Sequence, residues 1–134
     1  MFFEAIYFSV LLFQFKILND ILFTNHRLAK IGYVLSNLCT FCGSESETIN
    51  HLFYECSFTS QLWKEFETFW SLLSRERVDL IFQDVLLGKL DEGTDLFNYF
   101  IILLKLHIWV SRKQSVRPNL NVFKETVKAK FRTE

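Results

Sequence analysis

Proline and glycine are scarce in this chain, which has one proline and four glycines among 134 residues. This composition excludes a proline-rich linker and leaves no glycine-rich loop of the kind that cradles phosphates. No paired-carboxylate site and no Ser/His/Asp arrangement is visible, so an enzyme in its own right is not expected. Half of the residues are hydrophobic and sixteen are Phe, which is typical of a packed helical domain rather than a disordered segment.

The sequence also lacks an apolar run long enough to cross a membrane. The uninterrupted stretch from Ala5 to Phe13 covers nine residues, with Ser9 inside it, whereas a spanning helix needs about twenty. A secretory signal would have basic residues before its apolar run and small residues at a cleavage site, but Glu4 and bulky residues stand there instead. We therefore predict a buried helix at the start of the chain and no membrane association.

Cysteines are few, and all three lie in one short segment. Cys39, Cys42, His51 and Cys56 follow the pattern C-x2-C-x8-H-x4-C. An odd cysteine count without disulfide-style spacing predicts a reducing, intracellular compartment, either nucleus or cytoplasm. Three thiolates and one imidazole are a donor set that Zn²⁺ takes tetrahedrally in structural sites. We predict a structural zinc site, with zinc as the only cofactor.

The spacing of these ligands predicts the local backbone. Gly43 can adopt the positive φ that folds the chain back under the first cysteine pair. His51 and Cys56 would be separated by roughly 140° around a regular α-helix, so one unbroken helix cannot present both. We predict a short turn capped by Thr48, a break near Cys56 and a new helix starting at Ser57.

Two alternative interpretations of the cysteines stay open at the level of sequence. A redox C-x2-C pair is expected at a helix N-terminus after a βαβ pattern, whereas a Gly/Ser/Glu loop follows Cys42. That interpretation also gives Cys56 and His51 no role. The second alternative is that the cysteines are buried free thiols beside a hydrogen-bonded histidine. The clustering of all four residues favours zinc.

Apolar periodicity predicts a mostly α fold, a helical domain organised around a CCHC zinc knuckle. We expect a single domain over residues 1–134, with a zinc-binding segment at 13–73 and a helical C-terminal extension at 77–134. In the first helix Leu11, Phe15, Leu18 and Leu22 form one stripe, which predicts the face turned to the core. Helices are expected near residues 11–22, 24–32, 58–73, 78–85, 94–110 and 118–132.

Basic residues gather near the C-terminus although the formal net charge is zero. Residues 96–134 hold eight Lys or Arg and two Asp or Glu (+6), whereas residues 45–95 hold four and eleven (−7). A basic helix face is usually a solvated surface, but it can also neutralise phosphates. The candidate phosphate contacts are Arg112, Lys113, Arg117, Lys124 and Lys128.

Several short motifs resemble a known family. Residues 13–16 (FQFK), 24–28 (TNHRL), 39–43 (CTFCG) and 47–56 (ETINHLFYEC) stand in an order similar to the zinc-binding segment at the C-terminal end of LINE-type (non-LTR) retrotransposon reverse transcriptases. Residues 86–89 (LLGK), Trp109 and residues 118–123 are also similar to segments downstream of the zinc-binding motif in such elements. Residues 1–10 are expected to lie outside the resemblance.

The resemblance implies zinc ligation by Cys39, Cys42, His51 and Cys56. It also implies a module that helps a parent polyprotein hold template RNA or target DNA. The family's polymerase aspartates lie upstream of this module, so no polymerase activity is expected. The alternative function is a structural or protein-interaction module that packs on a reverse transcriptase or another protein and binds little or no nucleic acid.

Overall fold

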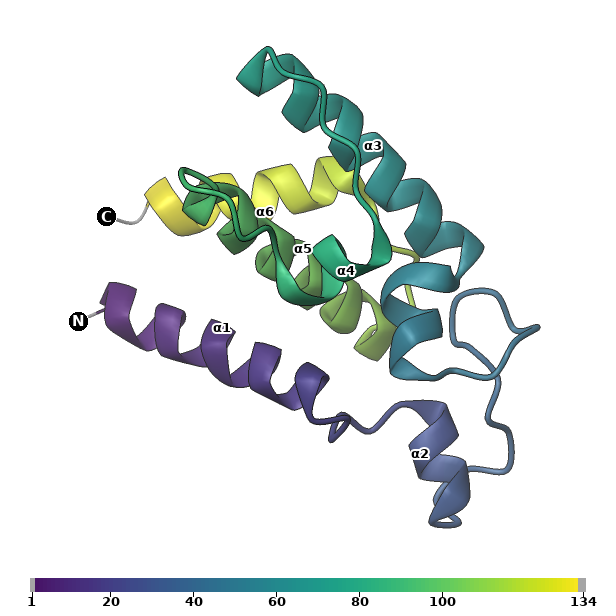
Figure 1. The fold of residues 1–134 in the computed structure, drawn as a ribbon. Helices are drawn as coiled ribbons and strands as arrows, with labels where there is room; N and C mark the ends of the chain where they lie inside the picture. The colour runs from purple at the N-terminus through teal and green to yellow at the C-terminus, as the bar shows by residue number, and fades with distance from the viewer. Residues whose placement is uncertain (1, 133–134) are drawn as a thin grey trace.

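The computed structural model describes residues 2–132 of the chain, with side chains from residue 8 to residue 130. Within that range the structure is helical, and the only strand pairing is an isolated antiparallel bridge between Leu38 and Ser46. The prediction of a mostly α fold is confirmed. Figure 1 shows the helices α1 (Phe2–Leu18), α2 (Asn25–Lys30), α3 (Ser57–Ser74), α4 (Phe82–Leu87), α5 (Asp95–Lys113) and α6 (Leu120–Arg132), and a π-helical turn, η1 (His51–Glu55), precedes α3.

Helix α5 forms the centre of the arrangement, with α1 on one side and α3 and α6 on the other (Figure 1). Its residues Ile101, Leu104 and Ile108 are almost completely buried. This position agrees with the sequence, which predicts a helix that is apolar on most sides. Phe53 of η1 joins the layers, because its ring lies 6.0 Å from the Phe13 ring of α1 and 6.4 Å from the Trp109 ring of α5.

The prediction that the first helix is buried is wrong for one of its two faces. Val10, Phe13 and Ile17 of α1 are buried against the core. The stripe that includes Leu11 and Phe15 points outward instead, with exposed fractions of 45% and 55%. Helix α1 is apolar all round, and α5 covers only one of its sides, so periodicity alone does not identify the inner face. Within residues 2–132 no helix is long and apolar enough to cross a membrane.

Helices α2 and α6 both begin close to their predicted starts, but the Thr24 side chain forms no capping hydrogen bond at the start of α2. Helix α2 begins at Asn25, directly after Thr24, and the turn beyond its end contains Gly32 at φ +79°, as the sequence predicts. Helix α6 begins at Leu120 rather than at Pro118. The Asn119 side-chain oxygen accepts a hydrogen bond from the Val122 N–H at 3.1 Å, the usual role of an N-cap side chain.

The segment after α3 is extended for longer than predicted. Residues 77–81 are non-helical, and α4 occupies only Phe82–Leu87. Side chains of α3 satisfy backbone groups of this segment: Ser71 Oγ accepts from the Val78 N–H at 2.9 Å, and Glu67 Oε1 accepts from the Leu80 N–H at 2.8 Å. These bonds replace the intrahelical bonds that a helix through Val78 would have formed.

Candidate metal centre

Four ligand atoms converge at one point between the loop 38–46 and η1. The side-chain donors of Cys39, Cys42, His51 and Cys56 all lie within 4.8 Å of one another. Cys39 Sγ is 3.9 Å from Cys56 Sγ, and Cys42 Sγ is 3.3 Å from His51 Nε2. Around a tetrahedral zinc with bonds of about 2.0–2.3 Å, ligand atoms are separated by roughly 3.5–3.8 Å. The two measured separations bracket that range, so the four residues form a potential zinc site.

The first cysteine pair is presented by a tight, hydrogen-bonded loop. The bridge between Leu38 and Ser46 closes its base, and the Cys39 N–H donates to the Glu45 carbonyl at 2.8 Å. At the tip the Gly43 N–H donates to the Cys39 carbonyl at 2.9 Å, with Gly43 at φ +67°. The predicted left-handed conformation of Gly43 is confirmed.

The second pair is presented by η1. The Cys56 N–H donates to the His51 carbonyl at 2.8 Å, which is the i to i+5 bond of a π-turn. This wider turn brings residues five apart to the same side, which a regular α-helix cannot do. Thr48 Oγ1 accepts from the His51 N–H at 3.0 Å, as predicted for its cap. Cys56 then has ψ 137°, and α3 begins at Ser57, so the predicted break is also confirmed.

Burial and hydrogen bonding set the ionisation of the thiols before any metal binds. Burial raises the pKa of the Cys39 thiol to about 12, although N–H groups of the loop partly oppose this shift. Burial also acts to raise the pKa of Cys42. Hydrogen bonds from the Ser44 hydroxyl, from loop N–H groups and from His51 outweigh it, so the pKa falls to about 6. The Cys42 thiol therefore loses its proton to an incoming metal more easily than an ordinary cysteine, and the Cys39 thiol loses its proton less easily.

The donor set identifies the class of metal and its role. Three sulfurs and one imidazole suit zinc and disfavour hard cations such as Mg²⁺ or Ca²⁺, which take oxygen ligands. Four protein ligands complete a tetrahedral shell, and no position is left for a water that could be activated. Two of the four, Cys39 and Cys56, are only 3% and 0% exposed. The arrangement is that of a structural metal site.

A buried carboxylate ties the metal loop to the rest of the molecule. Glu47 is 0% exposed. Its Oε1 accepts from the Asn25 N–H at 2.8 Å and from Arg112 Nε at 3.0 Å, and its Oε2 accepts from the Thr40 N–H at 2.7 Å. Arg112 also forms an ion pair with Glu47 at 3.0 Å. One side chain thus joins α2, the loop that carries Cys39 and the C-terminal end of α5.

Asn25 completes this network. Its side-chain N–H donates to the Leu38 carbonyl at 2.8 Å, and its Oδ1 accepts from Arg112 Nη2 at 2.9 Å. Sequence reasoning named Arg112 as a phosphate contact, but here its side chain is only 14% exposed and its donors are directed to Glu47 and Asn25. The role of Glu47 was missed. The available signal was its place at the start of the segment ETINHLFYEC, where an acid precedes the histidine ligand by four residues.

Two of the other predicted basic residues lie over aromatic rings of α3. The Arg117 guanidinium is 4.0 Å from the centroid of the Phe58 ring, and Lys124 Nζ is 4.1 Å from the centroid of the Phe69 ring. Both rings are half-buried, so each cation has a fixed platform. The border between α3 and α6 therefore carries two positioned positive charges.

Lys113 and Lys128 are exposed. Lys113 Nζ lies 5.6 Å from the centroid of the Trp109 ring. Lys128 Nζ is 3.5 Å from Glu125 Oε1 on the same helix, and both of these side chains are more than half exposed. Such a surface pair is weak, so it does not hold the ammonium group strongly.

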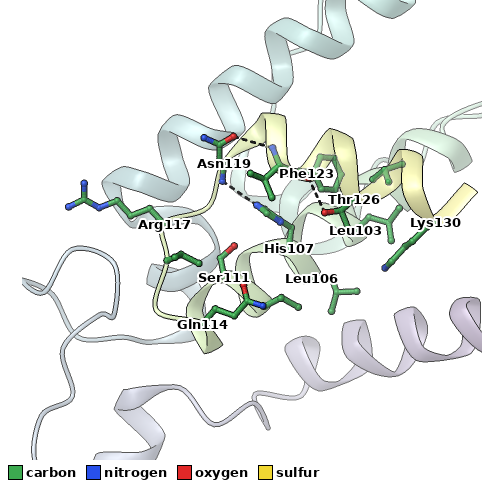
Figure 2. A pocket seen from close by; sticks show the side chains of 14 residues that line it. Leu103, Leu106, His107, Ser111, Gln114, Arg117, Asn119, Phe123, Thr126 and Lys130 are labelled. Carbon is green, nitrogen blue, oxygen red and sulfur yellow. Dashed lines mark hydrogen bonds between the residues drawn. The ribbon is translucent and has the colours of Figure 1, made fainter. Parts of the chain in front are cut away.

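A groove of about 450 Å³ lies between α5 and α6, and residues of both helices and of their connector line it (Figure 2). His107 on its wall accepts a hydrogen bond at Nε2 from the Asn119 N–H at 3.2 Å, and burial lowers the pKa of this histidine. The prediction that His107 is a core or edge residue rather than a ligand agrees with this position. Figure 2 shows the Arg117 side chain directed away from the other residues that line the groove.

Comparison with known proteins gives one family. Residues 1–63 match the family model described as zinc-binding in reverse transcriptase. The match contains all four clustered residues and covers slightly less than half of the chain, so α5 and α6 lie outside it. It begins at residue 1, so the expectation that residues 1–10 lie outside the resemblance is wrong. No curated protein and no solved structure gives a significant match. The metal-binding part of the chain is thus similar to a zinc-binding domain associated with reverse transcriptases.

Proposed function

We propose that this chain is a non-catalytic, zinc-stabilised accessory domain of the LINE-type reverse transcriptase kind, and that it binds template RNA or target DNA. The observation that carries the proposal is that the family match and the four convergent ligand atoms fall in the same part of the chain. Residues 1–63 match a zinc-binding domain of reverse transcriptases, and the four potential ligands within that stretch converge. The proposed phosphate contacts are Lys113 at the end of α5, Arg117 in the connector that follows, and Lys124 and Lys128 of α6.

The zinc site supports this function by positioning the basic residues. Arg112 at the end of α5 is bound to Glu47, which also accepts from the backbone of the metal loop at Thr40. Lys113 follows Arg112 directly, and Arg117 lies four residues further on, over Phe58 of the helix that starts after Cys56. Metal binding therefore fixes the positions of Arg112 and Arg117, which lie on either side of Lys113 in the sequence.

Nucleic-acid binding is tested by its salt dependence. Zinc-loaded protein would be titrated with fluorescently labelled single-stranded RNA and duplex DNA of mixed sequence at several salt concentrations. If phosphate contacts dominate, log affinity falls linearly with log salt, with a slope of about −0.7 to −0.9 for each phosphate neutralised. A salt-independent affinity, or no binding at low salt, would contradict the proposal.

A matched pair of charge variants locates the surface. The test variant replaces Arg117 and Lys124 of the α3–α6 border, together with the exposed Lys128 of α6, with Gln: R117Q, K124Q and K128Q. The control removes three exposed charges outside α6 and its connector, one within α3 and two in the segment after it: K64Q, R75Q and R77Q. We expect the test variant to lose about two to three units of salt slope and the control to keep the slope of the wild type. Equal losses in both variants would indicate a general charge effect and not a site.

A second candidate function is a structural or protein-interaction module. The observation that favours it is the outward face of α1, on which large apolar side chains such as Phe8 and Phe15 are 68% and 55% exposed. Such a face is typical of a surface that another protein covers. The two functions are separable, because substitutions on this face leave the basic residues of α6 unchanged.

A further inference from the structure

The outward face of α1 carries a regular apolar seam. Phe8, Leu11, Phe15 and Leu18 are 68%, 45%, 55% and 47% exposed. They are separated by three, four and three residues, which is the a–d spacing of a coiled-coil heptad. Single exposed apolar residues are ordinary on a protein surface, but a continuous stripe marks an interaction site. The heptad spacing indicates that the occupant of this site is another helix.

The seam is held outward by the packing of the opposite face. Val10, Phe13 and Ile17 are 1%, 7% and 3% exposed, and they fix α1 against the core. A rotation of α1 that buried the seam would bring these three residues into water. The seam therefore stays presented in the folded chain.

Over residues 8–15, charge does not select the partner of this seam. Residues 8–15 (FSVLLFQF) contain no ionisable side chain. Lys16 follows Phe15 at position b of the heptad, off the seam. In coiled coils, charges at the flanking e and g positions set partner choice and orientation. Here Leu12 and Gln14 occupy those positions, so the shape of the seam remains as the selecting feature.

The seam is complementary to the same seam of a second copy that runs in the opposite direction. When two copies of α1 lie antiparallel about the midpoint between Leu11 and Phe15, Phe8 of one copy faces Leu18 of the second, and Leu11 faces Phe15. Every layer then pairs a large ring with a smaller side chain, which fills space well. Parallel pairing would place Phe against Phe and Leu against Leu. We propose that this chain forms a twofold-symmetric homodimer through antiparallel α1 helices, with an isologous interface.

The size of the seam predicts a weak dimer. Two heptads of one helix bury less than the roughly 800 Å² per partner that is typical of stable complexes. We therefore expect a dissociation constant on the order of 10–100 µM, so that monomer and dimer exchange in solution.

Sedimentation equilibrium of the zinc-loaded full chain tests the dimer between about 1 and 500 µM. The test variant L11E/F15E places acids in the seam, and the control L72E/L73E makes the same kind of change at two exposed leucines of α3. We expect at least a tenfold weaker dimer for the first and no change for the second. A wild type that stays monomeric throughout, or a control that weakens the dimer equally, would overturn the proposal. Circular dichroism and zinc content verify that each variant is folded.

Disulfide trapping tests the antiparallel register. Leu11→Cys and Phe15→Cys are expected to crosslink when the two variants are mixed and oxidised mildly, because these positions face each other in the proposed dimer. Each variant alone is expected to crosslink much less. Efficient crosslinking of Phe8→Cys with itself would show a parallel arrangement and would rule out the proposed interface.

Discussion

At the scale of single residues, the four convergent ligand atoms are the central feature. Cys39 and Cys56 are buried sulfurs 3.9 Å apart, which is too far for a disulfide and close to the separation of two zinc-bound thiolates. Removal of any one ligand leaves the tetrahedral coordination of the metal incomplete, and the three remaining ligand side chains then have no metal to bind. The chain has three histidines, so a matched comparison is possible with a histidine outside the cluster.

His51→Ala should therefore abolish stoichiometric zinc binding, whereas His26→Ala should retain it. His26 is half-buried and hydrogen-bonded to Ser46, but it is not among the clustered residues. Elemental analysis of both purified variants measures the difference. Equal zinc content in the two proteins would show that His51 is not a ligand.

Glu47 is the residue whose replacement should be costliest outside the cluster. Glu47→Ala removes one partner of a buried ion pair and leaves the Arg112 guanidinium and the Asn25 and Thr40 N–H groups without their acceptor. We expect a loss of about 3–5 kcal/mol in the free energy of unfolding, measured by urea denaturation.

Glu125→Ala is the control for that measurement. It removes an exposed pair with Lys128, which should contribute about 0–1 kcal/mol. A Glu47→Ala variant as stable as Glu125→Ala would contradict the role of Glu47 as the link between the metal loop and α5.

The buried side chain of Lys105 should make the stability of the chain depend on pH. It is 1% exposed, and burial lowers its pKa from 10.5 to about 7. Its Nζ donates to neutral acceptors, Gln14 Oε1 at 2.6 Å and the Leu86 carbonyl at 3.2 Å. Between pH 7 and 10.5 the unfolded chain keeps a proton on this lysine that the folded chain has released. The contribution of Lys105 to stability therefore rises with pH across this window, by up to about 1.4 kcal/mol per pH unit.

Chemical denaturation of wild type and Lys105→Met across pH 7 to 10.5 measures this contribution. The variant should lose the slope that belongs to Lys105, because methionine fills a similar volume without a titrating group. Identical pH profiles for the two proteins would show that Lys105 ionises in the folded state as it does in water.

At the scale of elements, the contact between η1 and α3 keeps the second ligand pair in place. Trp63 Nε1 donates to the Phe53 carbonyl at 2.7 Å, and Thr59 Oγ1 donates to the Leu52 carbonyl at 2.7 Å. Both bonds are buried, and both satisfy carbonyl groups that a single π-turn leaves without helical partners. Helix α3 thus stabilises the unusual turn that presents His51.

Trp63→Phe should separate the hydrogen bond from the packing at this contact. The substituted phenyl ring keeps an apolar side chain at this position, but the Phe53 carbonyl loses its hydrogen-bond donor. We therefore expect a loss of about 1–3 kcal/mol in the free energy of unfolding, with zinc still bound. Thermal unfolding combined with zinc analysis checks both parts. A variant that keeps full stability would show that the bond to Phe53 contributes nothing.

The elements also show which features a sequence can predict. The loop of Gly43, the cap at Thr48 and the break at Cys56 were predictable because zinc ligands and capping residues act within a few positions of one another. The inner face of α1 was not, because all sides of that helix are apolar and only the location of α5 decides between them. The same limit applies to Arg112, whose partner Glu47 is 65 positions away in the chain.

At the scale of the whole molecule, the metal site and the helical core form a connected structure. The core contains Cys39 and Cys56 together with residues of α1, α3 and α5. Glu47 adds a polar link from the metal loop to α5. Loss of the metal should therefore do more than loosen one loop, because structural zinc contributes on the order of 10–16 kcal/mol to small zinc-dependent folds. We expect at least residues 38–73 to lose their structure.

The most direct measurement is the metal content of protein purified without added zinc, with circular dichroism recorded before and after a strong chelator. One zinc per chain, with loss of helical signal on chelation and its return when zinc is restored, is the predicted result. Absence of zinc, together with a helical signal that the chelator does not change, would contradict a zinc-stabilised fold. Cys39, Cys42, His51 and Cys56 would then be ordinary core residues and not the ligands of a structural metal.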